Sequence, residues 1–363
     1  MSALIEDKSI FFLGATGYIG SAVLSKLLNY KKQYPITALS RSDEKVELLN
    51  KLRDNVKGLK GSLDDLDLVE EQASKHDIIF NTADADHLDV TKALLKGMAK
   101  RKAETGHRPV YIHTSGTGVL ADDAAGNYET MKIYSDLGAN PEAKPPLLSI
   151  DSLPDSALHR NVDLLILEAD ARADIRSFII LPSTIYAINQ CELVDKGIGN
   201  NQSIQMPALI KASIDRKRPG VVGKGHNIWP NVHIKDVAEL FIVVYDLALA
   251  GNKGNHGRQG YFFAESGEHT LFSVGQTIGQ AMVKYKLTDD PEPTTFSKDE
   301  IDKYFGGSDY LGSNSRARGD RSRRIGWRPK YEAEDFFRSL DEEVKVTLSK
   351  ANGDGTFHFG GKL

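Results

Sequence analysis

The sequence predicts an α/β fold with a doubly wound parallel sheet. Short apolar runs alternate with amphipathic segments from residue 10 to about residue 182. The first apolar run is followed by three glycines at three-residue spacing, Gly14, Gly17 and Gly20, and then by apolar residues at helical spacing. Repeated alternation of strand and helix requires a parallel sheet covered by helices on both faces, and right-handed crossovers produce the doubly wound arrangement.

The three glycines predict a dinucleotide-phosphate site. In a strand–loop–helix unit the first glycine permits the tight turn, the second lets the backbone approach a pyrophosphate, and the third lets the helix pack close to the strand. Free N–H groups in the first helical turn then face the phosphates. The loop residues expected to contact the dinucleotide are Gly14, Thr16, Gly17, Tyr18, Ile19 and Gly20.

The second strand, expected at residues 35–39, is followed by the residues that choose the cofactor. An acidic side chain there would bind the adenosine ribose hydroxyls, whereas an arginine beside small hydroxyls fits a 2′-phosphate. Arg41 and Ser42 occupy this place, with Asp43 next to them. The sequence therefore favours NADP(H) (NADPH in its reduced form), and Asp43 leaves NAD as the less favoured alternative.

Further strands and helices follow in alternation. Strands are expected at residues 56–59, 77–83, 109–115 and 177–182, and helices at residues 44–55, 66–74, 90–103 and 156–171. Ligands of open parallel sheets bind at the carboxyl ends of the strands. The cofactor contacts expected at or just after these ends are Ser62, Leu63, Thr82, Ala83, Thr114 and Pro182.

The rhythm of strands and helices changes after residue 186. We expect residues 1–190 to form a Rossmann nucleotide-binding domain, with residues 228–250 packing back onto it. Residues 191–227 and 251–350 would form a smaller C-terminal lobe on the substrate side. The Gly- and Pro-containing stretch 116–153 reads as irregular, and residues 351–363 read as a flexible tail.

Composition excludes several classes of function. A net charge of −4 over 363 residues argues against nucleic acid as the main partner. The single cysteine, Cys191, excludes an intramolecular disulfide and fits a reducing compartment. The N-terminus has no basic segment followed by an apolar stretch, and the ten histidines show no metal-ligand spacing. We therefore expect a cytoplasmic protein with a small-molecule substrate, without a membrane partner or a metal.

By its motifs the chain resembles the extended short-chain dehydrogenase/reductase superfamily and its NAD-dependent epimerase/dehydratase-like members. The resemblance covers about residues 9–331. It rests on the glycine loop, on Thr114-Ser115 and on the segments 181–186, 231–238 and 324–329. It implies a Rossmann domain with a small C-terminal lobe and NAD(P) chemistry on alcohols, carbonyls or nucleotide sugars. It also implies a homodimer formed through the helices at 90–103 and 156–171.

The family's catalytic Tyr-x-x-x-Lys pair is absent from the helix that should carry it. In the family, the tyrosine exchanges a proton with the reacting oxygen, and the lysine one turn later lowers the pKa of that tyrosine. In register with that motif, His159 or Arg160 falls at the tyrosine position. Asp163 or Leu164 falls at the lysine position, so neither member of the pair is present.

The candidates for the missing proton-transfer group are Tyr128, His159 and, through its hydroxyl, Ser115. Tyr128 and Lys132 repeat the Tyr-x-x-x-Lys spacing earlier in the chain, although the glycine and proline that follow allow at most a short helix. His159 and Asp163 lie at positions i and i+4 and would share a helix face. A carboxylate beside an imidazole orients the ring and favours its charged form, which suits a general acid.

Two further features have alternative interpretations. Ser115, or Thr117 just after it, matches the family's hydroxyl that holds the substrate oxygen. The arginines between residues 316 and 328 could meet an acidic or phosphorylated substrate, but a solvated basic face is the simpler interpretation.

The function expected from the whole is an NADP(H)-dependent oxidoreductase of atypical extended type, acting on a small carbonyl or alcohol. The missing catalytic pair favours an alternative, a dinucleotide-binding sensor like the NmrA-type members, without redox turnover. The hydroxyls of Thr114 and Ser115 and the expected substrate-side lobe favour the enzyme. Epimerase- or dehydratase-like chemistry with a retained cofactor is a third alternative.

Overall fold

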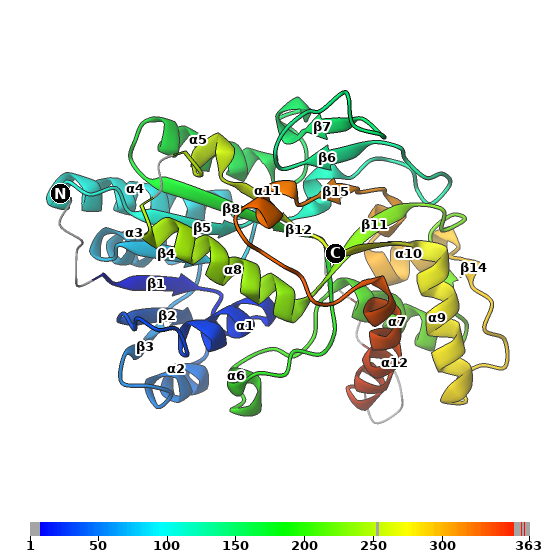
Figure 1. Ribbon diagram of the computed structural model, residues 1–363. Helices are drawn as coiled ribbons and strands as arrows, with labels where there is room; N and C mark the ends of the chain where they lie inside the picture. The colour runs from blue at the N-terminus through cyan, green and yellow to red at the C-terminus, as the bar shows by residue number, and fades with distance from the viewer. Residues whose placement is uncertain (1–7, 252–253, 352–356, 358, 360–363) are drawn as a thin grey trace.

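Seven parallel strands form the central sheet of the computed structural model, which describes residues 8–251, 254–351, 357 and 359. The strand order is β12-β8-β5-β4-β1-β2-β3 (Figure 1). The bounds are β1 Ile10–Leu13, β2 Ile36–Ser40, β3 Val56–Lys60, β4 Ile78–Asn81, β5 Val110–Thr114, β8 Arg176–Pro182 and β12 Tyr261–Ala264. The direction of strand order reverses between β1 and β4, which is where doubly wound sheets bind ligands. The predicted Rossmann-like α/β fold is confirmed.

Helices cover both faces of this sheet. Helices α1, α2 and α8 pack on one face, and α3, α4 and α5 pack on the other. Their bounds are α1 Tyr18–Leu27, α2 Asp43–Asn50, α3 Leu66–Lys75, α4 Leu88–Thr105, α5 Arg160–Ala171 and α8 Ile234–Leu249. In Figure 1, α8 runs across the front of the sheet. Two of these helices differ in length from the prediction. Helix α5, expected at 156–171, begins later, and α2, expected at 44–55, ends earlier.

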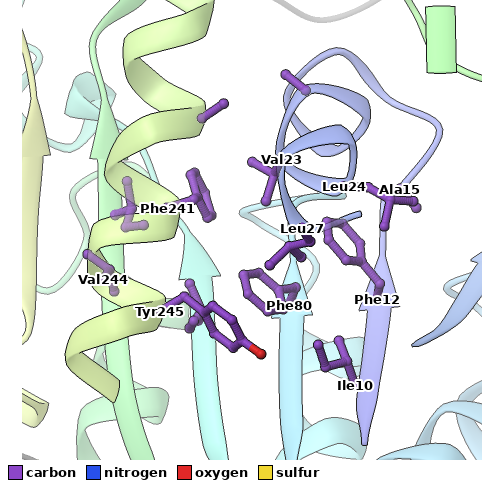
Figure 2. Close-up of a cluster of buried hydrophobic side chains, with 14 of the residues drawn as sticks. Ile10, Phe12, Ala15, Val23, Leu24, Leu27, Phe80, Phe241, Val244 and Tyr245 are labelled. Carbon is purple, nitrogen blue, oxygen red and sulfur yellow. The ribbon is translucent and has the colours of Figure 1, made fainter. Parts of the chain in front are cut away.

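Alternating side chains in each strand supply the two cores. In β1, Phe12 belongs to the core under α1 and α8, whereas Phe11 belongs to the core under α3 and α4. This follows from the two-residue period of a strand. Phe12 stacks on Phe80 with ring centroids 5.2 Å apart, and Figure 2 shows Leu27 next to both rings and Tyr245 on the other side of Phe80. These aromatic contacts hold β1, and with it the glycine loop, at the centre of the sheet.

The long segment expected to be irregular contains short ordered elements. They are η1 Thr117–Leu120, β6 Ile133–Ser135, β7 Leu147–Ser149 and η2 Ile150–Ser152. Strand β6 pairs with β7 and with β15 Ala317–Arg318. The Asp136 carboxylate then accepts hydrogen bonds from Arg321 N and Ser322 N in α11 Asp320–Arg324, at 2.6 and 3.1 Å. The segment is therefore tied to the C-terminal part of the chain, which its sequence alone does not indicate.

A third core lies in the C-terminal lobe. Its helices are α7 Gln205–Asp215, α9 Leu271–Lys284, α10 Lys298–Phe305 and α12 Ala333–Ser349, to the right in Figure 1. The strands β9 Thr184–Tyr186, β11 Ile228–His233 and β13 Gly267–Thr270 form one small sheet, and β10 Gly220–Val221 pairs with β14 Thr294–Thr295. The remaining short elements are α6 Glu192–Asp195, η3 Gly257–Gln259 and η4 Tyr310–Gly312.

The expected division of the chain is wrong for one strand. Residues 261–264 form β12, which pairs with β8 at the edge of the main sheet rather than joining the lobe. Most of the expected tail, 352–356, 358 and 360–363, lies outside the described residues. Cys191 is half-buried at the start of α6, and not fully buried as its type suggests. Among the described helices, none is long and apolar enough to span a membrane.

Glu343 is a buried carboxyl group in the lobe. Gln202 Nε2 donates to its Oε2 at 2.9 Å, while Oε1 has no partner among the described residues. Burial raises the pKa of Glu343 to about 7. The folded chain therefore binds a proton that the unfolded chain releases between about pH 4.5 and pH 7.

Because the folded chain holds this proton more tightly than the unfolded chain, we predict that the free energy of unfolding falls as pH rises from about 5 to 8. A rise of this size corresponds to about 3 kcal/mol at pH 8. Replacing Glu343 with glutamine should therefore raise the free energy of unfolding at pH 8, with a difference that shrinks toward pH 5. Urea unfolding at several pH values measures it, with the exposed Glu342→Gln as control. Parallel stability curves for the wild type and Glu343→Gln would contradict it.

Candidate cofactor and catalytic site

A cleft of about 460 Å³ opens at the carboxyl ends of β1, β2 and β4. It is lined by the predicted residues Gly14, Thr16, Gly17, Arg41, Ser62, Leu63, Thr82 and Ala83. The sequence did not single out six others, which are Leu39, Ser40, Gly61, Asp64, Asp84 and His87. Four separate stretches of the chain, which follow β1, β2, β3 and β4, thus line the cleft where the strand order reverses.

The glycine loop is shaped by close backbone contacts. Gly14 has a φ of +81°, and a Cβ on it would lie 2.6 Å from the carbonyl carbon of Thr82. A Cβ on Gly20 would lie 2.0 Å from the carbonyl oxygen of Gly14. Gly17 is the N-cap of α1 and provides no side-chain cap. The first turn of α1 therefore offers its N–H groups to an anion, as a pyrophosphate site requires.

Two predicted loop contacts point away from the cleft. The Tyr18 hydroxyl donates to the carbonyl oxygens of Tyr186 and Ala187, at 3.0 and 2.6 Å. Ile19 packs against the core under α1. Only the backbone of these two residues is available to a dinucleotide. The Tyr18 side chain fixes the loop to the end of β9 and the residue that follows it.

The end of β2 carries positive charge. Arg41 is exposed beside the cleft, and Lys60 Nζ donates to the Arg41 carbonyl oxygen at 2.8 Å. Lys60 also pairs with Asp43 at 2.8 Å, which neutralises the nearest carboxylate. Ser42 does not line the cleft, since its hydroxyl accepts from Lys45 N at 3.3 Å and caps α2. An arginine, next to an aspartate that is already paired to a lysine, suits a 2′-phosphate.

His87 closes the opposite wall of the cleft. Its Nδ1 accepts from the N–H of Val90 at 3.2 Å, so the ring proton lies on Nε2. That nitrogen lies 3.2 Å from Asp64 Oδ1 and donates to it. The pair joins the loop after β3 to the start of α4, and no local pattern in the sequence indicates it.

The hydroxyls after β5 behave differently from one another. Ser115 Oγ donates to Asp163 Oδ2 at 3.2 Å, and both side chains are buried. Burial raises the pKa of Asp163 to about 7, and its Oδ1 has no partner within the described chain. The Thr114 and Thr117 hydroxyls are buried and also lack partners among the described residues. These hydroxyls lie at or just after the carboxyl end of β5, the edge of the sheet at which ligands of parallel sheets bind.

His159 pairs with a different carboxylate from the one predicted. It precedes α5 with a φ of +65°, so it does not share a helix face with Asp163. Its Nδ1 lies 2.7 Å from Asp86 Oδ1, in the loop between β4 and α4. This hydrogen bond holds the pKa of Asp86 below its ordinary value. The carboxylate fixes the proton on Nδ1, which leaves Nε2 to exchange a proton.

Two glycines after β5 face the free nitrogen of that imidazole. Cβ atoms built on Gly116 and Gly118 would lie 3.3 and 3.2 Å from His159 Nε2. A Cβ on Gly118 would also lie 2.5 Å from the hydroxyl oxygen of Tyr310. No motif in the sequence indicates Asp86 or Tyr310, which come from the loop after β4 and from the C-terminal lobe.

Tyr128 does not join this group. It lies on the irregular segment before β6, with its side chain half exposed, so it and Lys132 do not form the helical pair. It lines a separate pocket of about 500 Å³ with Gly225, His226 and Phe272. The last predicted cofactor contact, Pro182, is buried at the carboxyl end of β8. Of the candidates for proton transfer, Ser115 and His159 both lie at the start of α5. Ser115 bonds to Asp163 in the first turn of this helix, and His159 is its N-cap residue.

Most of the arginines between residues 316 and 328 are structural ties. Their ion pairs are Arg316–Glu268, Arg318–Asp320 and Arg323–Glu265. Arg321 Nε donates to the carbonyl oxygen of Asp136 at 2.8 Å. The group is therefore neither a simple solvated face nor a set of free cations for a phosphorylated substrate. No group of side chains in the described residues has the arrangement of a metal site.

Comparison with known proteins matches the first part of the chain to a family described as NAD(P)H-binding, over residues 14–143. The oxidase ucsJ of Acremonium sp. is 27% identical over 339 residues, covering 89% of this chain and 93% of that protein. An uncharacterized protein of Saccharomyces cerevisiae is 24% identical over 254 residues, covering 67% of this chain and 72% of that protein. The chain thus contains an NAD(P)-binding domain.

Solved structures share the fold over nearly the whole chain. A UDP-glucose 4-epimerase of Thermotoga maritima has a TM-score of 0.61 at 17% identity, covering 94% of this chain and 99% of its own. A dTDP-glucose 4,6-dehydratase of Bacillus anthracis, in complex with NAD, has a TM-score of 0.61 at 16% identity, covering 96% and 98%. The expected architecture of the NAD-dependent epimerase/dehydratase structures is confirmed.

Proposed function

We propose that this chain is an NADP(H)-dependent oxidoreductase that acts on a small carbonyl or alcohol, with His159 as the proton-transfer residue. The observation that carries the proposal is the Asp86–His159 pair, whose free Nε2 faces the glycines after β5. This group lies beyond the phosphate cleft, at the same edge of the sheet. The nearly full-length similarity to an oxidase supports redox chemistry.

The residues of the cleft would hold the cofactor by its two halves. The glycine loop and the first turn of α1 would bind the pyrophosphate, and Arg41 with Lys60 would bind the 2′-phosphate. Thr114 and Thr117 would contact the nicotinamide half. A bound nicotinamide cofactor would supply or accept the hydride.

Side chains of the protein would carry out the proton transfer. Asp86 holds the His159 ring by Nδ1, so Nε2 can give a proton to a substrate oxygen or take one from it. Ser115 already donates to Asp163, which leaves it only an acceptor role while Asp163 is charged. The arginine ion pairs leave few free cations for a nucleotide diphosphate, which favours an uncharged substrate.

A dinucleotide-binding sensor is the second candidate. The absence of the Tyr-x-x-x-Lys pair favours it, as does the engagement of Ser115 with Asp163. It would use the same cleft but no proton-transfer group. The homodimer expected from α4 and α5 and the cytoplasmic location remain predictions.

We predict that NADPH binds more tightly than NADH because of Arg41. Replacing Arg41 with alanine removes a charge-assisted contact, which should weaken NADPH binding about 10- to 100-fold and leave NADH binding nearly unchanged. Calorimetry measures both affinities, and Lys57→Ala, an exposed cation on β3 outside the cleft, is the control. Equal affinities of the wild type for the two cofactors would overturn the assignment.

We predict that His159→Asn lowers turnover by about 10²- to 10⁴-fold, the usual contribution of a positioned general acid. Asparagine tolerates the left-handed backbone at this position, so the fold and NADPH affinity should persist. The assay follows NADPH oxidation with a panel of carbonyl compounds, and the exposed His107→Asn is the matched control.

Two results would count against the enzyme as described. Full turnover by His159→Asn would show that the proton donor is elsewhere. NADPH binding at micromolar affinity without oxidation by any compound of the panel would favour the sensor.

A further inference from the structure

Tyr310 is placed against the proton-transfer group by the C-terminal lobe. It begins η4, and its ring packs edge-on against Trp229 of β11 with centroids 5.4 Å apart. The Trp229 indole donates to the carbonyl oxygen of Ser313 at 2.5 Å. The Ser308 hydroxyl accepts from Tyr310 N, and the Ser313 hydroxyl donates to Tyr310 O at 2.7 Å. The ring is therefore fixed by its own segment and by a strand of the lobe.

The far end of Tyr310 reaches the glycines after β5. Its hydroxyl oxygen and His159 Nε2 both approach the position that a Cβ of Gly118 would occupy, at 2.5 and 3.2 Å. Neither atom has a hydrogen-bond partner within the described part of the chain. Any side chain at residue 118 would displace the phenol, so glycine is required there. Two unpaired polar atoms from two lobes thus converge on one point.

The environment of the phenol keeps it protonated. Burial raises the pKa of Tyr310 well above its ordinary value, and the Asp86 carboxylate acts in the same direction. A phenol of this kind donates a hydrogen bond without giving up its proton. The imidazole beside it is the group that can exchange one.

We propose that Tyr310 is a catalytic residue of the site, whose hydroxyl holds the substrate oxygen while His159 moves the proton. This inference rests on the proposed function. In carbonyl reduction, the carbonyl carbon gains a hydride, the C=O electron pair moves onto oxygen, and oxygen takes the proton from His159 Nε2. The two electrons come from the reduced nicotinamide cofactor, and His159 regains its proton from solvent. Tyr310 donates to the oxygen throughout and keeps its proton.

In this assignment Tyr310, and not Ser115 as predicted from the sequence, holds the substrate oxygen. Ser115 donates its only hydroxyl proton to Asp163 while that carboxyl is charged. The substrate oxygen would instead be held from the side of the lobe. The position of Tyr310 against the glycines after β5 is then a condition for the chemistry.

The test uses Tyr310→Phe in the full chain, with Tyr304→Phe as the matched control. Tyr304 is a lobe tyrosine whose hydroxyl donates to Asp215 at 2.7 Å, away from the site. In the cofactor-free protein labelled with ¹⁵N-histidine, Tyr310→Phe should shift the His159 ring resonances, and Tyr304→Phe should not. Unmoved His159 resonances would overturn the inference, whatever the activity.

The second readout is kinetic and uses any compound of the carbonyl panel that the wild type reduces. Tyr310→Phe should lower kcat about 10²- to 10³-fold, the usual cost of one lost donor to a developing oxyanion. NADPH affinity and the shape of the pH–rate profile should stay as in the wild type, because Tyr310 keeps its proton. Unchanged kcat, or a profile that loses an ionisation, would overturn the role.

The two readouts separate this inference from the proposed function. If the wild type reduces no compound, the oxidoreductase proposal fails, and the role in holding a substrate oxygen fails with it. The His159 resonances would still decide whether the Tyr310–His159 contact exists. If turnover is found but Tyr310→Phe keeps it, the oxidoreductase proposal stands and only the role of Tyr310 is wrong.

Discussion

The close backbone contact between the glycine loop and the end of β4 is the constraint on which the site depends. No side chain fits at Gly14 or Gly20, because a Cβ would overlap the backbone of Thr82 or of Gly14 itself. The contact brings the N-terminus of α1 to the carboxyl edge of the sheet and leaves its N–H groups free. The stacked Phe12 and Phe80 hold the two strands in register beneath it. Cofactor binding is thus a consequence of how β1, α1 and β4 pack.

The proton transfer that we propose does not use the tyrosine and lysine of the Tyr-x-x-x-Lys motif. Asp163 stands where the lysine is expected but is buried against Ser115, where it cannot support a charge on a neighbouring phenol. The left-handed backbone at His159 turns its ring toward Asp86 instead. In the mechanism that we propose, a carboxylate and an imidazole take over proton transfer, and the phenol of Tyr310 approaches from the opposite lobe.

The sequence predicted what local chemistry determines. The glycine spacing, the arginine after β2 and the alternation of apolar runs identified the fold and much of the cleft. Partners distant in sequence were not predictable, since Asp86 lies 73 residues before His159 and Tyr310 belongs to the C-terminal lobe. The i, i+4 spacing of His159 and Asp163 misled because the helix begins only at Arg160. Likewise, residues 261–264 were expected in the C-terminal lobe because a long segment separates them from the other strands, but they form β12 of the main sheet.

The proposed mechanism requires the cofactor and the proton-transfer group to meet at the carboxyl ends of β4 and β5. A crystal structure of the chain with NADPH tests it most directly. The account predicts the 2′-phosphate on Arg41 and the nicotinamide C4 facing Gly116 and Gly118, within one substrate's reach of His159 Nε2. A nicotinamide that points away from these glycines, with His159 open to solvent, would contradict the account.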